Sequence, residues 1–448
     1  MNIKLISPKM SLRPMDSEFK RRLSPSLALV TLASLIDKKH SVYIEDENIQ
    51  DINFNDHPDL VGITVNVDTS KRAYEIASIY RKKGVKVILG GIHVSSNPEE
   101  AIQYADSVCI GEAEEIMNTI VSDAQNNKLK KYYYNSSVTD PKNIPIPNWS
   151  LINKSKYLYT NIICSSRGCP FKCEFCYNSS KFVHHKYRNR PISTVIEEIR
   201  QMKTKQVMFI DDNFIGNPQH AMALMQELKK HDLTWHAAVS TNIVHMPKLM
   251  DLMQESGCKS LFIGFESINP ESIKDANKKQ NHVELYEVLI KELHSRDIMV
   301  NASLVFGFDN DTPDVFKSTL DWLVKNKVET MTAHILTPYP GTVLYERLLH
   351  DGRIIDFDTK HYNTANVVYS PKHMTAEQLR EGYLWIYDQF YSFKNIIKRL
   401  PEKRKQRIPY LLFNFGYRKF GKIISILGKL GLMNFLGKIG RKLSYDIE

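Results

Sequence analysis

The sequence predicts an α/β protein in three parts: an N-terminal Rossmann-like domain, a partial (β/α)6 barrel and a C-terminal helical region. Short apolar runs alternate with helical patterns up to residue 134, and six further strand and helix repeats follow from residue 157. After residue 370 the pattern becomes helical and basic. At 448 residues the chain is long enough for two or three domains, each with its own core.

The first domain, residues 1–134, carries the alternation typical of a parallel sheet with crossover helices. We expect helices at Leu27–Ile36 and Ser70–Lys83, and strands at Ile3–Ile6, Val42–Glu45, Leu60–Thr64, Val85–Leu89 and Val108–Ile110. Loops at the carboxyl ends of such strands bind the ligand in a doubly wound fold. A linker over residues 135–156 follows, because Pro141, Pro145 and Pro147 cannot continue a helix.

The barrel is predicted over residues 157–370. Its six candidate strands are Tyr159–Cys164, Val207–Asp211, Thr234–Val239, Leu261–Phe265, Met299–Phe306 and Met331–Leu336. Six units leave a barrel open on one side. Active sites of such barrels lie at the carboxyl ends of the strands.

Three cysteines with unusual spacing follow the first barrel strand. Cys169, Cys173 and Cys176 are separated by three and then two residues, which suits three corners of a cubane iron–sulfur cluster. The fourth iron would keep a free position for a small molecule. A structural zinc site normally takes four closed ligands, and a zinc loop or three reduced core cysteines are the alternatives. We interpret the remaining cysteines as small buried apolar residues: Cys109, Cys164 and Cys258.

This motif, with Phe175 before the third cysteine and Ser166-Arg167-Gly168 before the first, resembles the signature loop of the radical S-adenosylmethionine (SAM) superfamily. The resemblance implies a [4Fe-4S] cluster whose open iron chelates SAM. Reduction, by an external donor such as flavodoxin or ferredoxin, would cleave SAM to methionine and a 5′-deoxyadenosyl radical.

Polar residues recur at the predicted strand ends. Asp211-Asp212-Asn213 resembles the Asp-Asp-Asn step of cobalamin-type members, and Glu266 suits ribose hydroxyls because a carboxylate accepts two O–H bonds. For any one of these residues a helix cap or a turn is the alternative. The expected SAM-binding set is Phe175, Asp211, Asp212, Ser240, Asn242, Glu266 and Asn301.

The loops of the first domain resemble the cobalamin-binding domain that precedes the barrel in one class of radical SAM enzymes. Glycines there would let backbone approach a flat macrocycle. The expected cobalamin-binding set is Thr64, Gly90, Gly91, His93, Gly111 and Glu112. The domain has no Asp-x-His-x-x-Gly, which by resemblance implies cobalt without a protein histidine below it. A merely hydrogen-bonding His93, and a Rossmann unit without corrin, remain alternatives.

Cysteine positions narrow the branch of the family. No cysteine follows Cys258, which argues against auxiliary clusters, and Cys109 alone precedes residue 135, which argues against methylthiotransferases. We therefore expect a cobalamin-dependent C-methyltransferase acting on an unactivated carbon. A cyclase or other C–C bond-forming enzyme, and a non-catalytic electron-transfer or sensing module, are the alternatives.

Residues 371–448 predict helices with a basic amphipathic tail, the first helix capped by Thr375. Between Ile396 and Leu443 thirteen Lys and Arg face one acidic residue, Glu402, so the net charge of +10 belongs to the tail. Apolar residues interleaved with lysines, as in Ile423–Leu430, are typical of an interfacial helix. We expect a membrane surface as a partner and a lipid or isoprenoid substrate; a basic cap packed on the barrel is the alternative.

Composition bounds the remaining classes. The cluster motif needs free thiols, and the chain starts with a strand pattern and not with a targeting segment. We therefore expect a cytoplasmic enzyme, either free or peripheral at the inner face of the membrane. No apolar run approaches the roughly 20 residues of a membrane span. No recognition motif accompanies the basic tail, which argues against nucleic acid as a partner.

Overall fold

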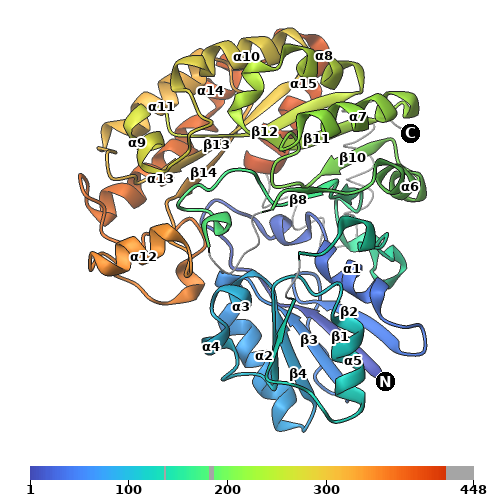
Figure 1. Cartoon of the computed structure of the whole chain (residues 1–448). Helices are drawn as coiled ribbons and strands as arrows, with labels where there is room; N and C mark the ends of the chain where they lie inside the picture. The colour runs from blue at the N-terminus through green and yellow to red at the C-terminus, as the bar shows by residue number, and fades with distance from the viewer. Residues whose placement is uncertain (136–137, 181–185, 420–448) are drawn as a thin grey trace.

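Two parallel six-stranded sheets form the centre of the molecule (Figure 1). The computed structural model describes residues 1–135, 138–180 and 186–419. The first sheet has the order β2-β1-β3-β4-β5-β6. Its strands are β1 Asn2–Ser7, β2 Ser41–Asp46, β3 Leu60–Thr64, β4 Lys86–Gly90, β5 Ser107–Ile110 and β6 Tyr132–Tyr134.

Helices cover both faces of this first sheet, as the apolar runs of its strands require. One face packs against α1 (Leu27–Leu35) and α5 (Met117–Gln125), and the other against α2 (Ser70–Lys82). The short helices α3 (Ile92–Ser96) and α4 (Pro98–Ala101) follow β4. All five predicted strands are present. The sixth, β6, was not predicted, because a three-residue edge strand leaves too short a pattern to recognise.

Between the sheets the chain runs through three single turns of 3₁₀ helix, at Pro141–Asn143, Trp149–Leu151 and Lys154–Lys156. Asp140, Asn148 and Asn153 cap these turns with their side chains. Over residues 138–156 the linker therefore contains no long helix.

The second sheet has the order β14-β13-β12-β11-β10-β7, also fully parallel. All six predicted barrel strands are present: β7 Ile162–Ile163, β10 Gln206–Phe209, β11 Thr234–Val239, β12 Cys258–Glu266, β13 Met299–Phe306 and β14 Thr330–Ile335. The order is linear, so β14 and β7 form two edges and the barrel is partial, as predicted. A small antiparallel ribbon, β8 (Ser166–Arg167) with β9 (Arg188–Asn189), was not predicted.

Helices surround the outside of the barrel. They are α6 Ile192–Met202, α7 Pro218–Leu228, α8 Pro247–Glu255, α9 Pro270–Asp275, α10 Tyr286–Ser295, α11 Asp314–Lys325 and α12 Val343–His350. Alternate strand residues such as Trp235, Ala237 and Val239 pack outward against these helices in one large core. The residues between them, such as His236 and Ala238, face the lumen.

The C-terminal helices close one edge of the barrel. Two tyrosine hydroxyls of α13 (Ala376–Phe390) bind the backbone of β14. Tyr387 lies within this helix, and Tyr391 caps its C-terminal end. The Tyr387 hydroxyl donates to the Ala333 carbonyl at 3.0 Å and accepts from its N–H at 2.8 Å, and Tyr391 does the same at Met331. The open edge of β14 is thus saturated by side chains.

Thr375 caps α13 as predicted, with Gln378 completing a capping box. The helices α14 (Phe393–Lys398) and α15 (Arg404–Leu411) follow, and the chain then forms a π-helix over Leu412–Lys419. Arg399 is fully buried, with its guanidinium donating to the carbonyls of Val328, Glu329 and Phe390. The described part of this region is therefore a cap on the barrel. The predicted interfacial helix Ile423–Leu430 lies outside the described residues.

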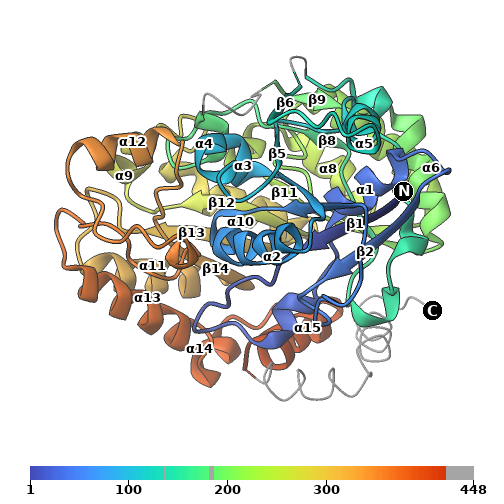
Figure 2. The ribbon, with the colours of Figure 1, turned by 90° about the horizontal axis from the view of Figure 1, so that it is seen from below.

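The N-terminal segment Pro8–Leu23, which we call the strap, crosses the open side of the barrel (Figure 2). At one edge, Arg13 approaches His334 of β14, with 3.4 Å between Nη1 and Nδ1, and Tyr383 donates to the Met15 sulfur at 3.2 Å. At the other, the carbonyls of Arg22 and Leu23 accept from the N–H groups of Leu158 and Tyr159 at 2.8 Å. The strap thus spans the gap between β14 and β7.

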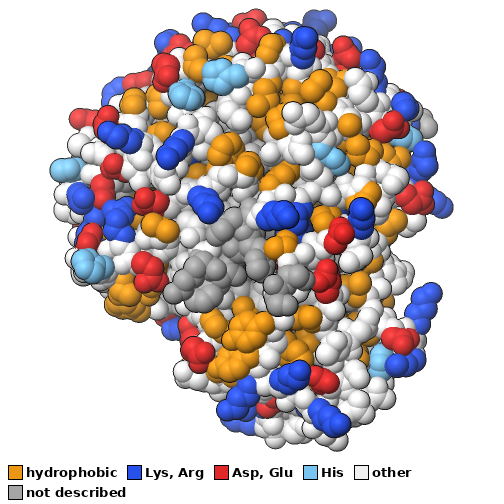
Figure 3. Space-filling view, in the orientation of Figure 1, with side chains coloured by type: hydrophobic (Ala, Val, Ile, Leu, Met, Phe, Trp, Pro, Cys, Tyr) orange, Lys and Arg blue, Asp and Glu red, His pale blue; other side chains and the backbone are white. Residues whose placement is uncertain are grey.

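Surface charge on the body is mixed. Figure 3 shows Lys and Arg interspersed with Asp and Glu over the barrel helices, rather than gathered in one groove. None of the helices in the described part of the chain is both long and apolar enough to cross a bilayer.

Candidate functional site

The three cysteines lie on a loop between the ribbon and the first domain. The loop leaves β8 through Gly168, whose φ of 79° favours glycine, and ends in the 3₁₀ turn Tyr177–Ser179. Cys173 is buried, and Cys169 and Cys176 are half-buried. Burial raises the pKa of all three thiols, that of Cys176 to about 12. Binding to iron would therefore have to displace their protons.

The loop fits an iron–sulfur cluster. Each of the three thiols is close enough to another for a thiolate charge on one to raise the pKa of its neighbour. The Gln280 amide donates to Cys173 Sγ at 3.7 Å. Within the described residues no three His, Cys, Asp or Glu side chains form a cage for a single ion. A cubane does not need such a cage, because each thiolate binds a different iron.

Asp211 and Asp212 hold this loop in place. Asp211 is buried and accepts from the Ser165 N–H at 3.1 Å, the Ser165 hydroxyl at 2.8 Å and the Ser166 hydroxyl. Asp212 accepts from the Gly168 N–H at 3.1 Å. Burial raises the pKa of both carboxyls. Both predicted SAM residues therefore already serve as anchors for the residues before Cys169.

Asn213, Ser240 and Asn242 form a hydrogen-bonded chain at the ends of β10 and β11. The Asn213 amide donates to the Ser240 hydroxyl at 3.1 Å, which donates to Asn242 Oδ1 at 2.5 Å. Oδ1 of Asn213 and Oε1 of Gln280 are buried and accept no hydrogen bond in the described structure. Buried unpaired acceptors cost free energy, and the ammonium group of SAM is a donor that would satisfy them. Asn213 and Gln280 were not among the predicted SAM residues.

Glu266 lies at the end of β12 in an unusual backbone conformation. Its φ is 61°, rare for a non-glycine residue, and the ladder to β13 shifts register here. The carboxylate pairs with Lys278 and both side chains are buried. Sequence reasoning missed Lys278, because nothing local distinguishes it from the lysine beside it.

Phe175 and Asn301 lie apart from this group. The Phe175 ring packs edge-on against Phe308, with 6.2 Å between centroids. Asn301 sits near the start of β13, paired with Phe262 and three residues before Leu304, the partner of Glu266, which is about 10 Å along the strand. There it accepts from the Thr332 hydroxyl at 3.3 Å. The structure thus places Asn301 lower in the lumen than the other candidates.

The glycines of the first domain serve two different needs. A Cβ on Gly91, where φ is 108°, would lie 2.8 Å from the Val65 carbonyl and 3.2 Å from the Thr64 hydroxyl. Gly91 and Gly90 thus let the loops after β3 and β4 pack together; the Gly90 carbonyl accepts from Val65 at 2.8 Å. Gly111, with φ of 83°, faces open space, where an added Cβ would meet no atom within 4 Å.

His93 lies inside this domain. Its side chain is fully buried in α3, and Nε2 stands 3.6 Å from Glu100 Oε1. Burial opposes the charge of Glu100, yet His93 and Tyr74 lower the pKa of that carboxyl. The ring thus packs inside its own domain, with Glu100 as its nearest charged neighbour.

Glu112 joins the two domains. It receives two bonds from the Arg188 guanidinium, at 2.6 and 2.8 Å, and lies 3.5 Å from Arg167. Arg167 also pairs with Glu114. Burial opposes ionisation of Glu112, but Arg188 and Arg167 lower its pKa to about 2. This predicted cobalamin residue therefore clamps the ribbon of the cluster loop to the first domain.

The carboxyl ends of both sheets converge at one interface. The Tyr177 ring, directly after Cys176, stacks on Tyr339 with 5.0 Å between centroids. Burial raises the pKa of both hydroxyls, and the nearby charges of Cys176 and of Asp68, in the loop after β3, raise it further. The Tyr177 hydroxyl is buried without a hydrogen-bond partner in the described structure. A cluster held by the cysteine loop and a ligand held by the loops of the first domain would therefore lie next to each other at this interface.

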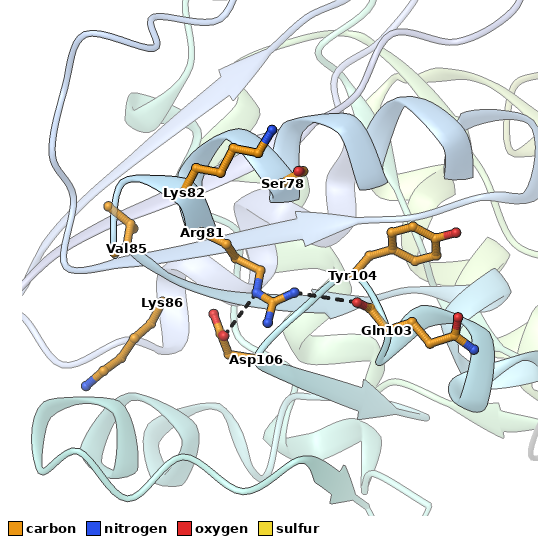
Figure 4. A pocket seen from close by; sticks show the side chains of 9 residues that line it. Ser78, Arg81, Lys82, Val85, Lys86, Gln103, Tyr104 and Asp106 are labelled. Carbon is orange, nitrogen blue, oxygen red and sulfur yellow. Dashed lines mark hydrogen bonds and ion pairs between the residues drawn. The ribbon is translucent and has the colours of Figure 1, made fainter.

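A separate pocket of about 460 Å³ lies at the opposite end of the first sheet (Figure 4). Arg81 crosses it, bound to Asp106 at 3.1 Å and to the Gln103 carbonyl at 3.5 Å. This pocket is at the amino end of β4, away from every strand end discussed above. It belongs to neither candidate site.

Comparison with known proteins gives the same division of the chain. A family model for the B12 binding domain matches residues 25–121, one for the radical SAM superfamily matches residues 163–323, and a domain of unknown function (DUF4070) matches residues 342–410. The bacteriochlorophyllide d C-12(1)-methyltransferase of Chlorobaculum tepidum is 31% identical over 394 residues, 85% of this chain and 86% of the relative.

Two further similarities extend over most of the chain. The hopanoid C-2 methylase of Rhodopseudomonas palustris is 26% identical over 354 residues, 76% of this chain and 67% of that protein. The structure of the radical SAM methyltransferase TsrM from Kitasatospora setae, with cobalamin and a [4Fe-4S] cluster, superimposes with a TM-score of 0.70 at 14% identity, covering 96% of this chain and 98% of that one.

A three-cysteine loop at the mouth of a partial barrel, facing a doubly wound domain, defines an iron–sulfur enzyme with a second cofactor domain. The chain belongs to the radical SAM enzymes that carry an N-terminal cobalamin-binding domain. Its cofactors are a [4Fe-4S] cluster, SAM and cobalamin. Like other radical SAM enzymes, it acts on a small molecule and needs an external electron donor.

Proposed function

We propose that this enzyme is a C-methyltransferase that acts on an unactivated carbon of an apolar, lipid-like molecule. The observation that carries the proposal is the shared interface at which the cluster loop meets the strand ends of the cobalamin-binding domain. The cofactors supply reductive cleavage of SAM, hydrogen abstraction and a transferable methyl group. The relatives described above are named as methylating enzymes of a chlorin pigment and a hopanoid.

The residues of the chain have separable roles in this proposal. Cys169, Cys173 and Cys176 hold the cluster. Asp211 and Asp212 fix the loop that carries them. A second group binds SAM at the strand ends: Asn213, Ser240, Asn242, Glu266 and Gln280. Gly111 and Thr64 lie at the edge where the corrin would bind.

The lumen supports an apolar substrate. Phe262 is 37% exposed although both neighbours on β12 are buried outward in the core, and Ile210 after β10 is 40% exposed. Large apolar side chains rarely stay accessible on barrel strands unless a ligand covers them. Beside Phe262 in the ladder, Asn301 of β13 and Thr332 of β14 offer hydrogen bonds that would orient a polar end.

Cluster assembly and SAM cleavage test the enzymatic part. Protein purified without oxygen and reconstituted with iron and sulfide should show iron–sulfur absorption and release 5′-deoxyadenosine from SAM under strong reductant. Replacing any of the three loop cysteines by alanine should abolish both. Cys258→Ala, at the far end of β12, is the matched control and should retain the cluster. Wild-type protein that binds iron but leaves SAM intact would contradict the proposal.

Product analysis tests the methyl transfer. With hydroxocobalamin, SAM labelled in its methyl group and a lipid extract of the source cell, we expect the label in an apolar product. A product that has lost hydrogen without gaining the label would favour the cyclase alternative. Bound cobalamin should be visible directly in the absorption spectrum of the loaded protein.

We further propose that the enzyme works at an anionic membrane surface. The exposed faces of α14 and α15 carry Phe393, Ile397 and Ile408, at 57%, 60% and 49% exposure, among several lysines and arginines. Apolar side chains framed by cations suit an interface with anionic lipid, where each Lys or Arg adds about 1 kcal/mol.

Vesicle flotation tests this second proposal. The full chain should float with phosphatidylcholine vesicles that contain phosphatidylserine and remain behind with phosphatidylcholine alone. Ile397→Glu combined with Ile408→Glu should weaken flotation. Val288→Glu, at a residue 46% exposed on α10, is the control and should float like wild type. Equal flotation on both vesicles, or none, would overturn the membrane proposal.

A further inference from the structure

Lys278 is a buried cation between two parts of the active site. Its ammonium pairs with the Glu266 carboxylate, and the side chains are 8% and 9% exposed. A buried lysine without a partner would lose its charge, whereas a tight ion pair keeps both groups ionised. Burial opposes the charge, but Glu266 and Cys173 together raise the pKa of Lys278. The lysine therefore remains cationic beside the cluster loop.

The segment that carries Lys278 lies alongside the cluster loop and is hydrogen-bonded to it at several points. The Ala276 carbonyl accepts from the Glu174 N–H at 3.1 Å, and the Asn277 amide reaches the Lys172 carbonyl at 3.4 Å. Two residues beyond Lys278, Gln280 donates to Cys173 Sγ. Asn281 then binds the carbonyls of Gly264 and Phe265 at 2.9 and 3.0 Å. One short segment thus ties the middle cysteine to the end of β12.

The backbone of β12 is shaped for this pair. The left-handed conformation at Glu266 turns its carboxylate back over Gly264. A Cβ on Gly264 would lie 2.5 Å from Glu266 Oε1 and 2.7 Å from Lys278 Nζ. A side chain at position 264 would therefore displace the carboxylate and the ammonium from their contact. The left-handed backbone at Glu266 is strained, and such strain is typical of functional sites. The geometry therefore protects the ion pair at the expense of local stability.

Lys278 lies between two contacts with the cysteine loop. The Ala276 carbonyl accepts from the Glu174 N–H on one side and the Gln280 amide donates to Cys173 Sγ on the other, so the charge of the lysine stands beside this loop. Loss of a proton from a thiol and gain of an electron by a cluster both make the local charge more negative. A nearby cation therefore favours both changes.

We propose that Lys278 is a positioning residue that couples SAM binding at Glu266 to the reduction of the cluster. The inference rests on the proposed function, in which Glu266 receives the ribose of SAM. When ribose hydroxyls bind the carboxylate, Glu266 neutralises the lysine less effectively, and the cluster accepts its electron more readily. Coupling of this kind is reciprocal, so reduction of the cluster would also tighten SAM binding.

Three variants and a control separate the roles. Lys278→Met removes the charge and keeps the stem, and Lys278→Arg keeps the charge. Glu266→Gln removes the carboxylate, and the thiolates of the adjoining cysteine loop then remain as the counter-charge of the lysine. Lys279→Met changes the exposed neighbour and serves as the control. The readout is the midpoint potential of the reconstituted cluster, titrated by electron paramagnetic resonance with and without SAM.

We expect Lys278→Met to lower the reduction equilibrium constant about tenfold, about 59 mV for a one-electron couple. The same variant should lose most of the change in potential that SAM produces. Lys278→Arg should restore both, Glu266→Gln should shift the potential upward, and Lys279→Met should match wild type.

A cluster in Lys278→Met with the potential and the SAM response of wild type would overturn the proposal. If that variant assembles no cluster, the upward shift in Glu266→Gln decides instead, and no shift there overturns it. The proposed function is tested apart from this, by SAM cleavage in the wild-type enzyme.

Discussion

At the scale of single residues, buried carboxyls set the pH response of the barrel. Asp311 accepts from the N–H groups of Gly307 and Phe308 at 2.9 and 3.1 Å and from the Ser272 hydroxyl at 2.8 Å. Burial outweighs these bonds and raises the pKa of Asp311 from 3.8 to about 6. The folded protein thus holds this proton more tightly than the unfolded chain does.

Stability should therefore fall as pH rises from about 4 to 6, by about 3 kcal/mol from this group. Asp311→Asn preserves the shape and can accept both N–H groups through its oxygen while donating to Ser272. In urea titrations we expect the variant to lack this part of the pH dependence. Parallel pH profiles for the two proteins would contradict the assignment.

Sequence reasoning at this scale found the residues that form local patterns. The spacing of the three cysteines can be read from the loop itself. The same holds for the glycines of the first domain, Gly90, Gly91 and Gly111. The position of Asn301 below the other candidates could not be predicted, because the sequence does not tell how far along β13 a polar residue lies from the strand end. Lys278 and Gln280 were missed because their roles exist only after α9 returns the chain to the cluster loop.

At the scale of elements, the tyrosines on α13 replace a neighbouring strand. Tyr387→Phe would leave the Ala333 N–H and carbonyl buried and unpaired on one side, at a cost of about 1–3 kcal/mol. We expect a lower urea midpoint with an unchanged slope. Tyr132→Phe, whose hydroxyl makes an exposed bond to Glu99, is the control and should change little.

The clamp between ribbon and first domain should be equally measurable. Glu112→Gln removes the carboxylate that Arg188 and Arg167 share, and we expect faster hydrogen exchange at Arg188–Asn189 and a lower melting temperature. Glu75→Gln, at an exposed residue paired with Arg72, should stay within about 0.5 kcal/mol of wild type. Equal exchange in the two variants would show that the clamp does not hold the ribbon.

Prediction of elements succeeded where the strands are apolar. Runs such as Leu60–Thr64 and Met299–Phe306 have the β-branched and aliphatic residues of buried parallel strands, and their bounds agree with the structure. The ribbon β8–β9 was missed because two polar residues on each side carry no periodicity. Its stability comes from the ion pairs to Glu112 and Glu114, which only the folded chain brings together.

At the scale of the whole molecule, the cofactors should bind the two halves into one unit. In the proposed function, cobalamin binds the first domain at the interface that also carries the cluster loop. At about 100 times its dissociation constant, a ligand of the folded state adds about 2.7 kcal/mol. We expect hydroxocobalamin to raise a single melting transition by a few degrees. Two transitions, of which one alone moves, would show that the domains unfold independently.

The strap imposes an order on the folding of the chain. Its residues Ser11, Arg13 and Met15 find their partners at Asn363, His334 and Tyr383, which lie 352, 321 and 368 residues further along the chain. The strap can therefore dock only after β14 and α13 have been synthesised. Until then the open side of the barrel lacks its cover.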